Sequence, residues 1–352
     1  MKFFQHRQTT VLFQRAPGMV LLVLTLSLIS IFLTACGAPQ QAKGQATGNA
    51  TPSHSPTPSH ASSPASSPTL SPPSSPTSSP ASSATFSHIF TIVLENHDYT
   101  SIIGKSDAPY LNSLASTYGL ATQYYAIGHP SLPNYMALTG GSTFGITSDC
   151  TACFQNAANL ADQIEASGRT WKAYMESMPS PCYIGDSPDG LYAQKHDPFL
   201  YYDDIRTNPT RCTTHVVPFT QFATDLSGNQ LPAYAWITPN MCHDMHDCSV
   251  AAGDTWLSQV VPLILRSAAF THGGLLFITF DEGETNAGCC NDAFGGQVTT
   301  LVISPLVKRG YRSTIAETHY SLLRTIEEIW GLPLLGEARN SKAMTEYFVY
   351  QV

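Results

Sequence analysis

Charged side chains are scarce in this sequence of 352 residues, in which only 12% are Asp, Glu, Lys or Arg. Four of the 17 basic residues lie before residue 86, whereas all 25 acidic residues follow it. Residues 86–352 therefore carry 13 basic and 25 acidic side chains, a formal charge of −12. Proteins that bind nucleic acids need clustered Lys and Arg. The composition therefore excludes a nucleic-acid partner and favours a site where carboxylates surround a cation.

The sequence also lacks a hydrophobic run long enough to span a bilayer comfortably. Its longest apolar stretch, Met19–Leu33, has about fifteen residues, whereas a transmembrane helix needs roughly 20. This stretch follows three basic residues and ends in Leu33-Thr34-Ala35-Cys36. That pattern predicts a bacterial lipoprotein signal peptide over residues 1–35, with Cys36 lipidated as the mature N-terminus. The alternative is an ordinary secretory signal with a chance cysteine.

Apolar residues are nearly missing from the segment that follows. From Thr51 to Thr85 the sequence is almost entirely Ser, Pro, Thr and Ala. Such a segment cannot bury enough apolar surface to offset the entropy lost on ordering. We therefore interpret residues 36–85 as a disordered Ser/Pro-rich tether. It would hold one domain, residues 86–352, at the extracytoplasmic face of a bacterial cell membrane, which is the layout of an anchored enzyme or receptor.

Eight cysteines follow Cys36, and an even number in an exported domain predicts disulfides. Plausible pairs are Cys150–Cys153, Cys182–Cys212 and Cys242–Cys248. The adjacent residues Cys289 and Cys290 form either a vicinal disulfide or two bonds to other parts of the fold. For Cys150-x-x-Cys153, half of a zinc site or a redox pair remains an alternative.

Strand-like and helix-like segments alternate from residue 88 to the end, and no internal repeat is visible. Strands are predicted at 88–94, 121–127, 170–175, 233–237, 275–280 and 298–303, and helices at 133–138, 156–167, 254–267 and 319–330. This alternation predicts an α/β three-layer sandwich with a largely parallel central sheet. Ligands bind beyond the carboxyl ends of the strands in such sheets.

Polar side chains gather at those strand ends. They are Glu95 and Asn96 after the first strand, Ser131 and Asn134 after the second, Asp244 and His246 after 233–237, Asp281 and Glu282 after 275–280, and His319 at the start of the last helix. One such group alone is typical of a cap or a turn. Five groups at one edge of one sheet indicate a functional site instead. We interpret His129, close to Ser131 in the sequence, as a structural histidine.

The carboxylates predict a metal site. Glu95, Asp281 and Glu282 would repel one another at close range, and a divalent cation removes that cost. With the amide of Asn96 they form an oxygen-rich ligand set that suits Mg, Mn or Ca. The nearby imidazoles could extend the site toward Zn.

The hydroxyl of Ser131 is the candidate nucleophile. It is expected just before a helix that has Pro in its first turn. A metal bound to this hydroxyl can deprotonate it for attack on phosphorus. The helix N-terminus and the amide of Asn134 would then stabilise the phosphate oxygens.

A family resemblance becomes visible at these motifs. They are Glu95-Asn96, HPSLPNYMALTGG (129–141), Lys195-His196-Asp197-Pro198-Phe199, TPNMCHDMHD (238–247), GDTWL (253–257), FDEGET (280–285) and THYSLLRTIEEIWGLPLLG (318–336). In this order they resemble the phosphoesterase family of bacterial and fungal acid phosphatases and phospholipases C. That family is similar in fold to the alkaline phosphatase superfamily, and the resemblance covers about residues 87–336.

The resemblance implies a role for each residue. It implies Glu95, Asn96, Asp281 and Glu282 as metal ligands, Ser131 as nucleophile and Asn134 as a phosphoryl-binding amide. It implies that Asp244, His246 and His319 bind a second metal or protonate the leaving group, and that Lys195 and His196 contact the substrate. The two-zinc phosphatases carry Asp-His where this chain has Asp281-Glu282, which favours a site richer in oxygen.

We therefore expect a metal-dependent phosphomonoesterase of the acid phosphatase type, acting on a small phosphate ester. A phospholipase C would need an apolar groove for diacylglycerol, and a non-catalytic surface lipoprotein should have lost Ser131 or a ligand. A sulfatase should carry Arg where Tyr135 stands, and the G-x-S-x-G elbow of α/β-hydrolases is missing from the sequence. The sequence leaves the oligomeric state open.

The anchor can be tested by the substitution Cys36→Ala. Without the lipid-accepting sulfur, the protein should be released into the medium or remain an unprocessed precursor. Fractionation of cells and medium measures this. A variant that still matures and still needs detergent for extraction would rule out the lipoprotein interpretation.

Overall fold

The computed structural model describes residues 86–349, so the predicted signal peptide and Cys36 lie outside the described residues. Its centre is an eight-stranded sheet with the order β5-β4-β6-β1-β7-β8-β2-β9. These strands are β1 His88–Leu94, β2 Gly119–Ala121, β4 Trp171–Met175, β5 Val216–Pro218, β6 Tyr234–Thr238, β7 Gly274–Phe280, β8 Thr300–Ile303 and β9 Arg312–Ser313. Two short strands, β3 Tyr124–Tyr125 and β10 Glu317–Thr318, form a second, parallel sheet.

The five strands from β5 to β7 run parallel, and β8 is antiparallel to both of its neighbours. Strands β1 and β7 lie in the middle of the sheet and are buried along almost their whole length. Their continuous apolar runs are typical of strands covered on both faces. The sequence-based prediction of a largely parallel sheet is therefore confirmed.

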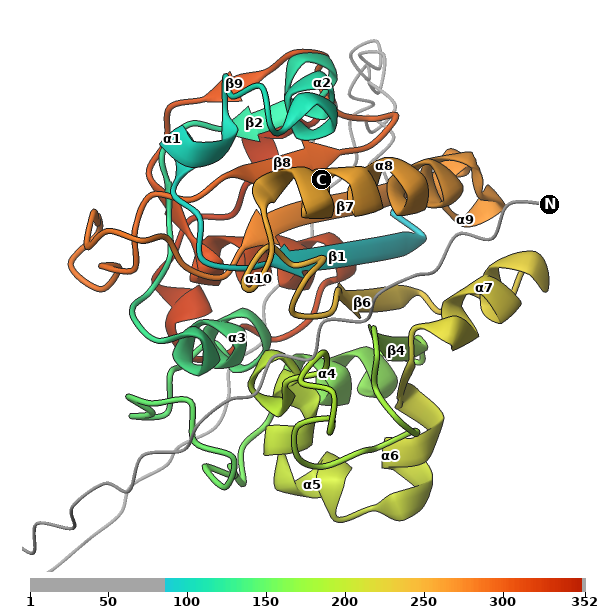
Figure 1. Ribbon diagram of the computed structural model, residues 1–352. Coiled ribbons are helices and arrows are strands. Elements are labelled where there is room, and N and C mark those ends of the chain that lie inside the picture. Colours follow the sequence, from blue (N-terminus) through green and yellow to red (C-terminus); the bar gives the residue numbers. More distant parts are fainter. Residues whose placement is uncertain (1–85, 350–352) are drawn as a thin grey trace, which may run out of the picture. The chain divides into compact units, whose positions relative to one another are not determined.

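Helices cover both faces of this sheet. They are α1 Tyr99–Ile102, α2 Pro109–Thr117, α3 Ser131–Gly140, α4 Leu160–Ala166, α5 Asp203–Arg206, α6 Pro209–His215, α7 Thr220–Ser227, α8 Val250–Arg266, α9 Ala268–Thr271 and α10 His319–Trp330. Short 3₁₀ turns lie at η1 Gln194–His196, η2 Pro198–Tyr201, η3 Gly336–Arg339 and η4 Thr345–Tyr347. Helix α2 packs with α8, and α3 packs with α10. Figure 1 shows α8 in front of β7, with α10 on the far side of the sheet.

Most predicted elements are present, and β1 and α10 have the bounds that the sequence predicted. Helix α10 ends at Gly331, whose φ of 64° is in the left-handed region that favours glycine. The predicted strand 121–127 was wrong. The chain leaves the large sheet after Ala121, and Tyr124 and Tyr125 pair with β10 in the second sheet instead. Alternation of residue types cannot show which sheet a strand joins.

Four disulfides cross-link the described residues: Cys150–Cys153, Cys182–Cys212, Cys242–Cys248 and Cys289–Cys290. The three predicted pairs are present, and the adjacent cysteines form the vicinal disulfide. Because both sulfurs of Cys150-x-x-Cys153 are bonded to each other, the zinc-ligand alternative does not apply to them. Among residues 86–349, no helix combines the length and the apolar character needed to cross a bilayer.

A buried carboxyl group lies where β10 leads into α10. The side chain of Glu317 is 1% exposed, and its Oε2 accepts a 2.7 Å hydrogen bond from the Tyr347 hydroxyl. Burial, together with the nearby Glu346 carboxyl, raises the pKa of Glu317 from 4.5 to about 9. Between those two pH values the folded protein keeps a proton that the unfolded chain releases. The contribution of Glu317 to the free energy of unfolding therefore falls as the pH rises through this window.

The substitution Glu317→Gln should stabilise the protein at pH 8 and change little at pH 4.5. Gln keeps an oxygen for Tyr347 and cannot ionise, so the free energy of unfolding at pH 8 should rise by about 2 kcal/mol or more. Urea denaturation at both pH values measures this. The control Glu328→Gln removes an exposed carboxylate paired with Arg324 and should change either value by less than about 1 kcal/mol. Equal stabilisation by Glu317→Gln at both pH values would contradict the assignment.

Candidate active site

The site begins where β1 and β7 end. The parallel register pairs Leu94 with Phe280, so the next residues, Glu95 and Asp281, emerge side by side at the carboxyl edge of the sheet. A hydrogen bond of 2.9 Å from the Asp281 amide to the Leu94 carbonyl extends the ladder by one residue. Both side chains are completely buried. The strand pairing alone thus brings two carboxyl groups together in the interior.

Ser131 faces these carboxyl groups from α3. It is the first residue of the helix, whereas the sequence placed it just before the helix. Its Oγ lies 3.0 Å from Glu95 Oε2 and 3.2 Å from Glu282 Oε1. The side chain is 1% exposed. A hydroxyl between two carboxylates can pass its proton to either of them, as a nucleophile requires.

Glu282 is held on its other side by His129, whose Nδ1 contacts the Glu282 Oε2 atom. We had interpreted His129 as merely structural, but it belongs to the site. With Asn96 and Glu284 it lines an open cavity of about 370 Å³ in front of Glu282. Its position two residues before Ser131 was the signal in the sequence that could have identified it.

Asn134 does not point its amide into the site. Its Nδ2 donates to the carbonyls of Gly128, at 2.8 Å, and Pro130, at 3.1 Å. Its Oδ1 accepts from the amides of Ile127 and Gly128. Both donors of the side chain are therefore used to fold the loop before Ser131. Asn134 therefore holds the loop before Ser131, and its side chain has no free donor for a phosphoryl oxygen.

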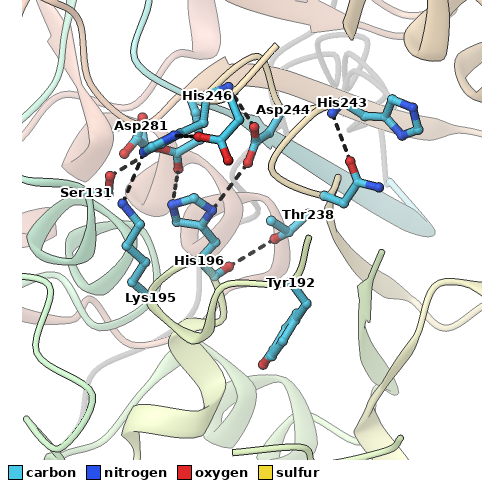
Figure 2. Close-up of polar contacts among 12 residues, drawn as sticks. Ser131, Tyr192, Lys195, His196, Thr238, His243, Asp244, His246 and Asp281 are labelled. Atoms are coloured by element: carbon cyan, nitrogen blue, oxygen red, sulfur yellow. Dashed lines mark hydrogen bonds and ion pairs between the residues drawn. The ribbon is translucent and has the colours of Figure 1, made fainter. Parts of the chain in front are cut away.

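His196 lies between two carboxyl groups, although the sequence predicted a contact with substrate. Its Nε2 is 3.1 Å from Glu95 Oε1 and its Nδ1 is 3.3 Å from Asp244 Oδ2, in directions that do not align as hydrogen bonds. Figure 2 shows the ring beside Asp244. Burial, with a smaller effect from Lys195, lowers the pKa of His196 well below its usual range. The ring is 2% exposed and is placed to orient carboxyl groups.

Tyr135 holds Glu95 by a hydrogen bond and was not predicted from the sequence as a site residue. Its hydroxyl donates a 2.5 Å hydrogen bond to Glu95 Oε1. Its ring stacks on His196 with centroids 5.2 Å apart. Because residues four apart share one face of a helix, the position of Tyr135 four residues after Ser131 could have indicated this contact.

Lys195 brings the positive charge of the site. Its Nζ lies 3.1 Å from Asp149 Oδ2 and 3.3 Å from His246 Nε2. Burial opposes its charge, but the carboxyl groups of Glu95 and Asp149 outweigh burial and raise its pKa. His246 also contacts Asp247 through Nδ1, and its amide donates to Asp244 Oδ1. Lys195 and His246 therefore lie on one wall of the site.

His319 is placed differently from the prediction. Its Nδ1 is 3.1 Å from the Tyr124 hydroxyl, and its Nε2 is 2.5 Å from the backbone carbonyl of Asp281. Burial lowers its pKa to about 4. With both ring nitrogens already in contact and the ring fully buried, His319 has no nitrogen left for a metal or a leaving group. It fixes the backbone at Asp281 instead.

Burial and mutual repulsion raise the pKa values of the carboxyl groups in the site, and a nearby positive charge would lower them again. Burial, then repulsion by Asp281 and Asp244, raises the pKa of Glu95 well above its usual range. Burial, then Glu282, does the same for Asp281. Burial raises the pKa of Asp244 to about 7. A cation bound among these groups would reverse all three shifts.

Several oxygens are free to meet such a cation. The buried atoms Asn96 Oδ1, Asp244 Oδ2 and Asp281 Oδ2 have no hydrogen-bond partner within residues 86–349. Buried polar atoms without partners need an explanation such as an ion or water. In the same residues, no three His, Cys, Asp or Glu side chains form a metal-binding group by themselves. A cation would therefore also use the oxygens of Asn96 and Ser131, both of which the sequence predicted as ligands.

Comparisons with known proteins point to one family. The family model "Phosphoesterase family" matches residues 104–333. The chain is 34% identical over 265 residues to a phosphatidylinositol-3-phosphatase of Mycobacterium tuberculosis, covering 74% of this chain and 82% of that protein. It is 33% identical to an acid phosphatase of Aspergillus fumigatus, covering 71% of this chain and 56% of that protein. A phosphate-repressible acid phosphatase of Penicillium chrysogenum is 31% identical, with 71% and 60% covered. The chain thus spans little more than half of these fungal relatives.

The fold has relatives among solved structures. A protein in the alkaline phosphatase superfamily from Vibrio parahaemolyticus superposes with a TM-score of 0.52 and 12% sequence identity. The match covers 76% of this chain and 72% of that one. At this identity the likeness shows the fold alone, and it agrees with the predicted alkaline-phosphatase-like architecture.

The hydrogen bond between Tyr135 and Glu95 predicts a kinetic effect. Tyr135→Phe keeps the stacked ring and removes the donor to Glu95, which would be ionised once a cation is bound. A hydrogen bond to a charged group contributes about 1.5–3 kcal/mol. The kcat/KM for phosphate-ester hydrolysis should therefore fall about ten- to a hundredfold.

Tyr202→Phe is the matched control. The Tyr202 hydroxyl contacts Thr139, which lies on α3 as Tyr135 does, and it contacts no carboxylate of residues 86–349. It should lower the free energy of unfolding by about 1 kcal/mol and leave kcat/KM within about twofold. Equal kinetic losses in the two variants would show that Tyr135 acts only through stability.

Proposed function

This chain belongs to the phosphoesterase family and is a phosphoric ester hydrolase, and from that premise we propose that it cleaves phosphate monoesters through a covalent intermediate on Ser131. The observation that carries the proposal is the position of the Ser131 hydroxyl, which lies within 3.2 Å of both Glu95 and Glu282. A hydroxyl between two proton acceptors, at the first turn of a helix, has the arrangement of an activated nucleophile.

The proposed reaction has two displacements. In the first, Ser131 Oγ forms a bond to phosphorus while the ester P–O bond breaks, and the hydroxyl proton moves to Glu282 or Glu95. The leaving oxygen accepts a proton from Asp244 or His246, and the alcohol departs. In the second, water attacks phosphorus in phosphoserine and gives a proton back to Asp244 or His246, phosphate departs, and the carboxylate returns its proton to Ser131. Lys195 offers positive charge to the phosphoryl oxygens, and Asn134 keeps the loop before Ser131 in place.

We further propose that a divalent metal ion completes the site. Glu95, Asn96, Asp281 and Glu282 would hold it, with Ser131 as an added oxygen ligand. When bound, it would neutralise the clustered carboxylates and favour the ionised hydroxyl of the nucleophile. The unpartnered oxygens and the raised pKa values support this, and oxygen ligands suit Mg, Mn or Ca. A Zn ion would have to draw on Asp244 and His246.

The cavities beside the site favour small substrates. They measure about 200 and 370 Å³, which suits the alcohol of a small monoester better than the two acyl chains of a phospholipid. We therefore keep monoester hydrolysis as the proposal and treat phospholipase C activity as the alternative.

The reaction is proposed to take place outside the cytoplasm. Four disulfides within one domain fit an oxidising compartment. The predicted lipid at Cys36 would hold the enzyme on the extracytoplasmic face of a bacterial membrane, and the Cys36→Ala experiment described above tests this.

Ser131→Ala tests the covalent step. Loss of the nucleophile should lower kcat by roughly three orders of magnitude or more. Acid quenching with ³²P-labelled substrate should trap phosphate on the unmodified protein and none on the variant. The control Ser304→Ala changes another buried serine, whose Oγ accepts only the Leu306 amide, and should keep both the rate and the trapped label. Near-full activity of Ser131→Ala would overturn the covalent mechanism.

A further inference from the structure

A second cavity borders the site on the side of Lys195. It has a volume of about 200 Å³, and its lining includes Asp149, Asp186, Tyr192, Ala193, Lys195 and Met241. It does not share residues with the cavity in front of Glu282. The proposed function uses only the size of this cavity, and the family resemblance implies a substrate contact for Lys195 alone among its lining residues.

This cavity is connected to the nucleophile. Asp149 Oδ1 accepts a 3.0 Å hydrogen bond from the amide of Leu132, the residue after Ser131. Its Oδ2 pairs with Lys195, which in turn contacts His246. A group that fills the cavity therefore lies against the same charged wall that faces the phosphoryl group. This is the expected place for the alcohol portion of the ester.

The walls of the cavity combine apolar and acidic surfaces. The Tyr192 hydroxyl donates toward the Tyr183 carbonyl and Asp197, each at 3.2 Å, so the ring is left to line the cavity. Figure 2 shows this hydroxyl pointing away from the carboxylate cluster. Ala193 and Met241 add further apolar surface. Aliphatic ring faces pack well on such a surface.

The charged groups of the cavity disfavour ligands that carry additional negative charge. Asp186 is exposed at the rim, and its Oδ1 accepts a hydrogen bond from the backbone amide of Gln194. Its carboxylate and that of Asp149 can accept hydrogen bonds from hydroxyl groups. Lys195 and Asp149 pair with each other and balance in charge, so Asp186 leaves the cavity lining with a net negative charge. This charge would repel a second phosphate, in a domain whose formal charge is already −12.

Disulfides hold the rim of the cavity in place. Asp149 adjoins the bridge Cys150–Cys153, and Met241 adjoins Cys242–Cys248. The segment that carries Asp186, Tyr192 and Ala193 follows Cys182, which is bonded to Cys212. A cavity that is formed before the ligand arrives costs less ordering on binding, which favours selectivity.

We propose that this cavity is a leaving-group pocket that selects monophosphates of uncharged, hydroxylated rings, such as sugar-like alcohols, over esters with a second phosphate. The proposal rests on the proposed function, because it assigns the alcohol portion of the same substrate. In this proposal, Ser131 and the surrounding carboxylates carry out the chemistry on the phosphoryl group. The cavity beside Lys195 determines which alcohols are accepted.

Three substrates test the pocket: glucose 6-phosphate, glucose 1,6-bisphosphate and methyl phosphate, which has almost no leaving-group body. In the unmodified protein, kcat/KM for glucose 6-phosphate should exceed the values for both other esters at least tenfold. Ala193→Trp should fill the cavity and lower the ratio of glucose 6-phosphate to methyl phosphate at least tenfold, and Ala193→Leu should lower it less. The control Ala343→Trp lies in a different cavity, beside Arg324, and should keep the ratio.

Charge selection has its own variant. Asp186→Asn keeps an oxygen for the Gln194 amide and removes the negative charge, so the preference for glucose 6-phosphate over glucose 1,6-bisphosphate should shrink at least threefold. Equal kcat/KM for all three substrates in the unmodified protein, or equal losses for all three in Ala193→Trp, would overturn the pocket.

A binding measurement separates this proposal from the covalent mechanism. Calorimetric titration of glucose 6-phosphate into Ser131→Ala should show binding that Ala193→Trp in the same background weakens at least tenfold. If Ser131→Ala stays active while the Ala193 variants behave as expected, the pocket stands and the role of Ser131 falls. If Ser131→Ala is inactive but Ala193→Trp leaves binding unchanged, the pocket is wrong and the mechanism stands.

Discussion

The parallel pairing of β1 with β7 brings Glu95 and Asp281 together in the interior. The other residues of the site contact or compensate these two carboxyl groups. Two neighbouring carboxyl groups that are both buried cannot both ionise without a compensating charge. Tyr135 donates to Glu95, and His319 fixes the backbone at Asp281. The oxygens without hydrogen-bond partners support the proposed cation. In this account, repulsion between like charges favours the binding of a metal ion at this edge of the sheet.

Segments far apart in the sequence bring complementary groups to this edge of the sheet. Helix α3 contributes the Ser131 hydroxyl, and the 3₁₀ turn η1 contributes Lys195 and His196. The loop after β6 contributes Asp244 and His246. In the two proposals above, the chemistry and the selection of the alcohol use different walls of the site. Carboxyl groups surround Ser131, whereas an apolar ring and two carboxylates line the cavity beside Lys195. Such separation allows one phosphoryl-transfer centre to serve different esters as the cavity changes.

The sequence predicted those parts of the site that follow from regular structure. Apolar runs located β1 and β7, and carboxyl ends of parallel strands meet at one edge, so Glu95 and Asp281 could be placed together. The position of His196 between Glu95 and Asp244 could not be predicted, because η1 lies in a long irregular segment without periodicity. The roles of Asn134 and His319 depend on which hydrogen bonds are already used, and only coordinates show that. The family resemblance named these residues without revealing their contacts.

The most direct test of the account is calorimetric titration of Mg, Mn or Ca into the metal-free protein at pH 6.5, in two buffers with different ionisation enthalpies. Because the pKa values of Glu95 and Asp281 are raised in the absence of a cation, metal binding must displace protons from them. The account predicts net proton release when the ion binds, and weaker binding with less proton release in Asp281→Asn. Failure of all three ions to bind, or binding with no proton release, would contradict the claim that buried carboxyl groups form a cation site around Ser131.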